Sequence, residues 1–224
     1  MIKNLSLINL ILDDISPSKP GLYKSRGEYI DIPSRSHMVS GPYDPETRRI
    51  SSEIYKTPFV PVVALTEYLI KYIQSAVKNI SSQTTPDDPH YISPSYLIDL
   101  KLIIKELNGF IESIKDRYYK QFEFPTTKYT KRLFVPSSVY KDESGKTIYR
   151  PITPVYAILN ELISELEYII KFSKKYKTKP TDIDFISVDE LTDMRKVIRE
   201  LKIFQSELKR KFSDQLDLPT FQSI

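Results

Sequence analysis

The chain has 224 residues, of which 40% are hydrophobic and 28% are charged, a composition that can bury a sizeable core and is not that of a disordered chain. The absence of cysteine excludes disulfides, thiolate nucleophiles and cysteine-ligated metal sites. The formal net charge of +4 permits an acidic partner without demanding one.

The first 36 residues are expected to be a short helix followed by an extended arm. Residues 1–12 are mostly apolar and lack the small-residue cleavage site of a signal peptide, so we interpret them as a docking helix or an arm that packs on a neighbour. Residues 16–36 are rich in Pro and Ser without clear periodicity, which is typical of an extended arm or linker. No segment of the sequence has the roughly 18 apolar residues of a membrane span, so no membrane partner is expected.

Residues 37–126 are predicted to form a β-hairpin followed by an antiparallel pair of long helices. The hairpin strands are expected at 37–40 and 49–55, around the turn-rich sequence 41–45. The helices are expected over 62–81 and 94–121. Pro61 can occupy a first helical turn, where its missing N–H costs nothing, and Ser93 is suited to cap the second helix.

Residues 127–224 are predicted to repeat this arrangement and to end in a C-terminal tail. Strands at 132–140 and 146–149 flank a turn at 141–145, and two amphipathic helices follow. Ser187 and Glu190 form the S-x-x-E pattern of a capping box. Apolar stripes of this kind, interrupted in the last helix only by Gln205, can close a helical bundle or pair as two helical hairpins.

An internal repeat relates these two regions. Residues 92–126 align without gaps on 186–220 with 12 identities in 35 positions, where two or three are expected by chance. The likeness extends upstream at an offset of 93 residues, for example from Pro58 to Pro151. We interpret the repeat as two copies of one module. The alternative is that two amphipathic helix pairs resemble each other only through their shared pattern.

No residue is predicted to be catalytic or to bind a cofactor or a metal. His90 follows two aspartates, but one histidine is a thin ligand set and a solvated loop is the simpler interpretation. His37 follows two serines, yet a triad also needs a positioned acid and an oxyanion site, so we expect a polar arm residue. The sequence 145–147 resembles the end of a phosphate-binding loop, but the leading glycine is replaced by Tyr140. An enzyme whose site is assembled from scattered Asp, Glu, Tyr and Lys is the remaining alternative.

Basic residues interleaved with tyrosines form a candidate nucleic-acid surface. The residues predicted for this contact are Lys128, Lys131, Arg132, Lys174, Lys175, Lys177 and Lys179. The other interpretation is that cations near helix C-termini complement the helix dipole, by about 0.3–1 kcal/mol each.

The expected fold is therefore mainly α, with two modules of a β-hairpin and a long antiparallel helical pair behind an extended N-terminal arm. The function that the sequence favours is a non-enzymatic structural protein that forms ordered oligomers with other copies of itself or with neighbouring structural proteins. The Ile-, Lys- and Tyr-rich composition is common in AT-rich genomes, including those of phages. It favours a virion component such as a neck, connector or tail ring protein, located in the virion or the host cytoplasm. A nucleic-acid-binding protein is the alternative.

Overall fold

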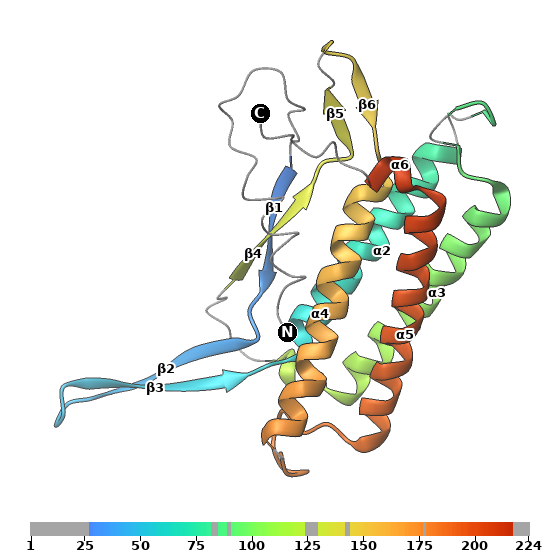
Figure 1. Cartoon of the computed structure of the whole chain (residues 1–224). Coiled ribbons are helices and arrows are strands. Elements are labelled where there is room, and N and C mark those ends of the chain that lie inside the picture. The colour runs from blue at the N-terminus through green and yellow to red at the C-terminus, as the bar shows by residue number, and fades with distance from the viewer. Residues whose placement is uncertain are drawn as a thin grey trace.

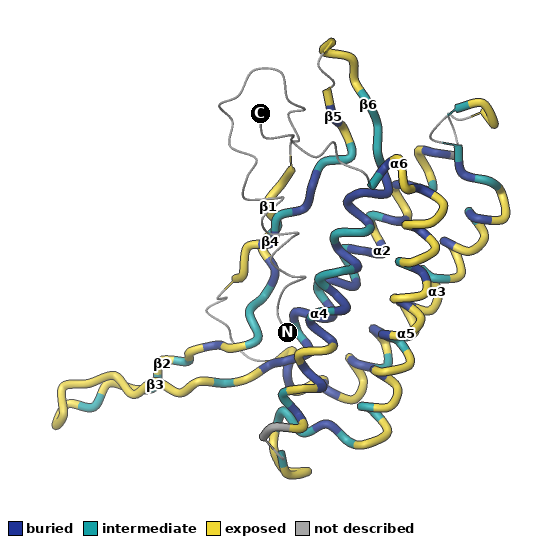
Figure 2. Tube along the Cα trace, viewed as in Figure 1, coloured by how far each residue is buried: buried dark blue, intermediate teal, exposed yellow. Residues whose placement is uncertain are grey.

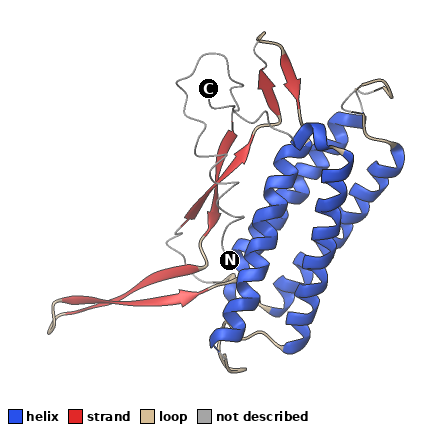
Figure 3. Ribbon diagram, in the orientation of Figure 1, coloured by secondary structure: helices blue, strands red, loops and turns tan. Residues whose placement is uncertain are grey.

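The computed structural model describes residues 27–81, 85–88, 91–123, 130–141, 144–176 and 178–216. Within these ranges the chain is mostly helical and carries three antiparallel sheets of two strands each (Figures 1 and 3). The predicted N-terminal docking helix at 1–12 lies outside the described residues.

Four long helices form an antiparallel bundle, as expected from the apolar stripes (Figure 1). They are α2 (Phe59–Ser81), α3 (Pro94–Arg117), α4 (Ile152–Tyr176) and α5 (Val188–Lys211). Helix α2 packs on α3, α4 packs on α5, and α2 and α4 contact each other in the centre. A 3-10 turn, η1 (Tyr119–Gln121), follows α3, and the short helix α6 (Ser213–Leu216) follows α5.

The predicted helix caps are confirmed. The Ser93 hydroxyl accepts a hydrogen bond from the backbone N–H of Tyr96, with Pro94 as the first helical residue. At α5, the Ser187 hydroxyl accepts from the Glu190 N–H, and the Glu190 carboxylate accepts from the Ser187 N–H at 2.8 Å. These reciprocal bonds satisfy backbone donors that have no partner inside the helix, so they fix where α5 begins.

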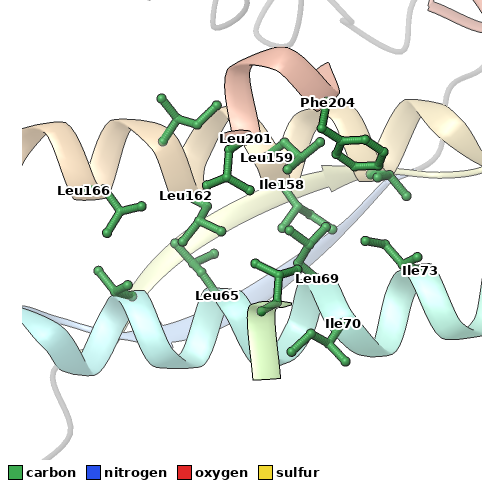
Figure 4. Close-up of a cluster of buried hydrophobic side chains, with 14 of the residues drawn as sticks. Leu65, Leu69, Ile70, Ile73, Ile158, Leu159, Leu162, Leu166, Leu201 and Phe204 are labelled. Atoms are coloured by element: carbon green, nitrogen blue, oxygen red, sulfur yellow. The ribbon is translucent and has the colours of Figure 1, made fainter. Parts of the chain in front are cut away.

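The core lies where α2, α4 and α5 face one another (Figures 2 and 4). Its central side chains are Leu65, Leu69, Ile73, Ile158, Leu159, Leu162, Leu166, Leu201 and Phe204. Phe204 lies outside the predicted heptad stripe and is nevertheless buried, within the cluster that α2 and α4 line (Figure 4). Gln205, the polar break in that stripe, donates a hydrogen bond to the side-chain oxygen of Asn160.

A two-stranded sheet that sequence reasoning did not predict covers one side of the bundle. Strand β1 (Gly27–Pro33) pairs antiparallel with β4 (Thr130–Pro136), and these strands pack on α2 and α4 respectively (Figure 1). Residues 27–33 were expected to belong to an extended arm. Instead they are a paired strand, because Ile32 buries its side chain on the helices, on the same face of the ladder as Leu133 and Val135 of β4.

The second hairpin is shorter than predicted. Residues 132–140 were expected to be one hairpin strand, but the chain divides them between β4 and β5 (Val139–Lys141), which pairs with β6 (Thr147–Tyr149). Pro136 ends β4, since proline has no N–H to continue a ladder. Leu133 and Val135 alternate along β4 and bury their side chains. This strand therefore packs on the bundle and is not part of the hairpin.

The first hairpin is confirmed and is longer than predicted. Strand β2 (Ser36–Asp44) pairs with β3 (Arg49–Lys56), and a bulge between Ser40 and Tyr43 carries the ladder through the segment that was expected to be the turn. The turn lies at 45–48 instead, where the Asp44 carboxylate accepts hydrogen bonds from the N–H groups of Glu46 and Thr47. Figure 1 shows this hairpin projecting away from the helices.

Two buried glutamines fix the ends of the helical pairs. The Gln121 side chain in η1 accepts a hydrogen bond from the N–H of Phe59, the first residue of α2, at 3.4 Å. The Gln215 side chain in α6 accepts one from the N–H of Ile152, the first residue of α4, at 3.3 Å. Each glutamine therefore ties the start of one helix to the chain that follows the helix packed beside it.

Candidate functional site

The root of the long hairpin is anchored to the bundle by a buried ion pair. Arg35, between β1 and β2, donates from Nε and Nη2 to the two carboxylate oxygens of Glu165 on α4, both at 2.6 Å. The guanidinium carbon also lies 3.6 Å from the ring centre of Tyr168. The Glu165 side chain is only 3% exposed, so its charge needs this partner. Burial alone would lower the pKa of Arg35, but the hydrogen bonds and charge of Glu165 outweigh it and raise that pKa.

Lys131 on β4 extends this ion pair into a small network. Its Nζ lies 3.4 Å from a carboxylate oxygen of Glu165 and 3.5 Å from one of Glu161. Arg35 and Glu165 are 130 positions apart in sequence. The network therefore joins three elements, β1–β2, β4 and α4, at the point where the hairpin leaves the body.

His37 is part of the same root and is not the polar arm residue that the sequence suggested. It is 3% exposed, and its Nε2 lies 2.6 Å from the hydroxyl of the buried Thr57, across the base of the hairpin. Burial lowers the pKa of His37, so the ring is neutral at neutral pH. No carboxylate among the described residues bonds to this ring. The contact closes the hairpin and is not the arrangement of a catalytic triad.

One face of the hairpin carries four exposed apolar side chains. Met38 pairs with Ile54, and Tyr43 pairs with Ile50, and residues directly opposite in an antiparallel ladder share a face. Their exposed fractions are 42%, 67%, 59% and 60% for Met38, Ile54, Tyr43 and Ile50. Figure 2 shows that nearly the whole hairpin beyond its root is exposed. We call this the apolar face of the arm.

No protein-family model, curated protein or solved structure matches this chain. Within the described ranges, no group of three or more His, Asp or Glu side chains is placed to hold a metal ion. Among the same residues, no helix combines the length and apolar character needed to cross a membrane.

The residues predicted to contact nucleic acid are spread over separate elements. Lys131 is engaged with Glu161 and Glu165, and Arg132 on β4 lies 3.9 Å from the carboxylate of Asp31. Lys174 near the end of α4 and Lys179 in the following loop are exposed. Lys175 lies in the last turn of α4, and Lys128 and Lys177 fall outside the described residues. Their predicted contact with nucleic acid stays a prediction.

A basic groove along α5 was not singled out by sequence reasoning. It is shallow, has a volume of about 560 Å³, and is lined by Arg195, Ile198, Arg199, Lys202, Ile203, Ser206, Glu207 and Arg210. Arg195, Arg199 and Arg210 form no ion pair within the described part of the chain, whereas Lys202 pairs with Glu167. The helical spacing of these cations was visible in the sequence. They do not stand together in a charge cluster, because apolar residues such as Val197, Ile198 and Leu201 lie between them along the chain.

A second cleft lies between β1, α2 and the short hairpin. We call it the tyrosine cleft; it measures about 280 Å³ and is lined by Glu28, Tyr68, Lys71, Tyr72, Ser75, Ala76, Asn79, Ser138 and Tyr149. The Tyr68 hydroxyl donates to the carboxylate of Glu28 at 2.5 Å. Burial raises the pKa of Tyr72, and its hydrogen bond with Ser138 partly offsets that effect. The cleft thus combines one carboxylate with three phenol rings.

Proposed function

We propose that this chain is a non-enzymatic structural protein that assembles into ordered oligomers, and that its two halves are copies of one module. In this proposal the β2–β3 arm carries the contact between subunits. The observation that carries the proposal is the apolar face of the arm, which four side chains expose to solvent on a hairpin that leaves the body of the protein.

Such an arm is poorly suited to standing alone in water. A two-stranded hairpin is marginally stable by itself, and both of its edges offer unpaired backbone groups to another chain. Its apolar face also lacks cover within the described chain, while its root is held rigidly by Arg35, Glu165 and His37. A surface of this kind gains stability when a neighbouring subunit covers it, and the rigid root sets the direction in which the arm reaches.

Equivalent contacts in the two halves support the proposed duplication. The Phe59 N–H donates to the side chain of Gln121, and the Ile152 N–H donates to that of Gln215. The sequence repeat aligns these two pairs of positions. Likewise, the N–H of Thr57 donates to the carbonyl of Arg35, and the N–H of Arg150 donates to that of Ser138. An accidental likeness between amphipathic helices does not predict matching bonds outside the helices.

A virion neck, connector or tail ring is the setting that we propose for this assembly. It is supported by the Ile-, Lys- and Tyr-rich composition, and by the way in which projecting arms stitch neighbouring subunits together without enlarging a core.

Native mass spectrometry of the full chain tests the assembly proposal. We expect one defined oligomer for the natural sequence. Replacing Tyr43, Ile50 and Ile54 by Ser removes most of the apolar face and should shift the mass to the monomer, with the helical circular dichroism unchanged. A variant of Arg49 and Ser51 to Asn alters the opposite face of the same arm and should keep the oligomer. A natural chain that stays monomeric at high concentration would overturn the proposal.

The basic groove on α5 favours a second candidate, a nucleic-acid-binding protein. The four cations from Arg195 to Arg210 are spread over 15 residue steps of helix, about 22 Å at a rise of 1.5 Å per residue, which suits a strand of phosphates. Fluorescence anisotropy with a labelled single-stranded oligonucleotide should then show binding that weakens steeply with salt. Changing Arg195, Arg199 and Arg210 to Gln should abolish it, and changing Lys174 and Lys179 to Gln tests the surface predicted from sequence. Absence of binding at low salt excludes this candidate.

A further inference from the structure

The tyrosine cleft and the Arg35 site occupy equivalent places in the two halves of the chain. The sequence Ile32-Pro33-Ser34 before Arg35 matches Val135-Pro136-Ser137 before Ser138, an offset of 103 residues. On the helices the offset is 93 residues, so Tyr72 on α2 stands where Glu165 stands on α4. The inference below rests on the duplication proposed above and is independent of oligomer formation.

Several contacts occur at positions that these two offsets relate. Lys131 on β4 contacts Glu161 on α4, and Glu28 on β1 accepts a hydrogen bond from Tyr68 on α2, at the matching pair of positions. Arg35 bonds to Glu165, and the matching Ser138 bonds to Tyr72. The two sites are therefore built on the same backbone frame but with different side chains.

The two sites differ in what fills them. In one, the guanidinium of Arg35 lies over Tyr168, and the ammonium of Lys56 lies 4.7 Å from the ring centre of Phe172. In the other, Ser138 replaces Arg35, Ser75 replaces Tyr168 and Asn79 replaces Phe172, and these shorter side chains leave the cleft of about 280 Å³. The volume is at the lower end of small-molecule pockets, which begin at about 300 Å³, and suits one planar ionic group on a short chain.

We propose that the tyrosine cleft binds a guanidinium group supplied from outside this chain, at the place that Arg35 fills in the other half. The carboxylate of Glu28 accepts hydrogen bonds from the planar cation, and Tyr68, Tyr72 and Tyr149 line the same cleft with aromatic rings, which attract a cation near them. The group comes either from a small guanidinium compound or from an arginine side chain of a second copy.

Lys71 is the one cation that lines the cleft, and it opposes such a ligand. Its side chain belongs to an exposed position of α2, so solvent screens its charge. The proposal therefore predicts opposite effects for the two kinds of ion. Removing the Lys71 charge should strengthen binding of a guanidinium ion and weaken binding of an anion.

Titration of the full chain with agmatine, followed by NMR of ¹³C-labelled tyrosine, measures the binding directly. We expect saturable shifts with a Kd of roughly 0.1–1 mM, as befits a ligand of this size. Putrescine has an ammonium in place of the guanidinium and should bind at least several-fold more weakly. Glu28→Gln should weaken agmatine binding about tenfold or more, and Lys71→Gln should tighten it.

Two variants control for indirect effects. Asp31→Asn removes a carboxylate from the same strand outside the cleft and should leave the affinity unchanged. Ser138→Arg together with Tyr72→Glu rebuilds the Arg35–Glu165 pair inside the cleft and should abolish binding while keeping the fold. Absence of saturable shifts at 10 mM agmatine, or equal binding by Glu28→Gln, would overturn the proposal.

The source of the group is separated by following the mass of the protein during the same titration. If the natural ligand is an arginine of a second copy, agmatine should dissociate the oligomer as it saturates the cleft. If it is a small compound, the cleft should saturate with the mass unchanged. Binding by a chain that proves to be a monomer supports the cleft and counts only against the assembly proposal.

Discussion

The two hairpins differ in length, and the shorter one is long enough to connect a strand to the helical bundle. Each precedes a long helix, and a backbone bond closes each one: the Thr57 N–H donates to the carbonyl of Arg35, and the Arg150 N–H donates to that of Ser138. The β5–β6 hairpin has strands of three residues, whereas β2 has nine and β3 has eight. Because the short hairpin suffices to connect β4 to α4, the additional length of β2–β3 is not required by the bundle. It lies in the solvent and carries apolar side chains, which is why we assign it to contact with another subunit.

The same comparison applies at the hairpin roots. The first root uses Arg35 and His37, and in the duplication that we propose Ser138 and Tyr140 stand at the equivalent positions of the second. Movement of a long hairpin strains its base more than movement of a short turn does, so the first hairpin needs the more rigid base. The second root holds only a short turn, and there Ser138, which is much shorter than an arginine, lines an open cleft.

The largest expected effect comes from removing the anchor of the long arm. Glu165→Ala leaves the guanidinium of Arg35 and the ammonium of Lys131 without their shared carboxylate. We expect a loss of about 2–4 kcal/mol in the free energy of unfolding, measured by chemical denaturation. Glu167→Ala, two residues away, breaks only the exposed pair with Lys202 and should cost less than about 1 kcal/mol. Equal losses for the two variants would show that the network does not anchor the arm.

The two buried glutamines differ in how many of their side-chain groups form hydrogen bonds. Gln121 accepts from the Phe59 N–H and also donates to the carbonyl of Ile183, whereas the Nε2 of Gln215 has no partner among the described residues. We therefore expect Gln121→Ala to cost about 2–3 kcal/mol and Gln215→Ala about 1–2 kcal/mol. Denaturation of both variants under the same conditions gives the order, and the reverse order would contradict this account of the helix ends.

The helices and their caps could be predicted from sequence because their signals are local. Apolar spacing, Ser93 and the Ser187–Glu190 box all act within one or two helical turns. The β1–β4 sheet could not, since pairing between residues about 100 positions apart leaves no local pattern and the Pro- and Ser-rich flank suggested a linker.

The candidate sites depend on the same long-range contacts. The repeat predicted from sequence aligned the helices and did not reach Arg35. The equivalence that we propose between Arg35 and Ser138 therefore needed the antiparallel pairing of β1 with β4. Charge clustering likewise directed attention to Lys128–Lys179 rather than to the cations spaced along α5, because it ignores which residues share a helix face.

A smaller effect is expected in the pH dependence of stability, to which His37 in the first root contributes. Burial lowers the pKa of His37 below its value in the unfolded chain, so the unfolded state takes up a proton more readily. The stability from this residue is complete above the unfolded pKa, near 6.5, and is lost as the pH falls through the lower folded value. Natural protein should therefore lose stability between pH 7.5 and 5.5, and His37→Gln should flatten that dependence. His90→Gln is the control, since it removes the only other histidine; a slope that disappears with His90 instead would contradict the assignment.

The smallest expected effect lies at the two hairpin tips. Arg48, in the turn of the long arm, has a φ of 53°, and Gly145, in the turn of the short hairpin, has a φ of 80°. A residue with a Cβ is strained in this region by roughly 1 kcal/mol, whereas glycine is not. Arg48→Gly should therefore stabilise its turn, and Gly145→Ala should destabilise its own, each by about 0.5–1 kcal/mol. Hydrogen exchange of the strand amides measures each hairpin separately, which matters because the arm can open without unfolding the bundle. If Arg48→Gly loosens the arm instead, the arginine side chain holds the turn by a contact stronger than the backbone strain that it imposes.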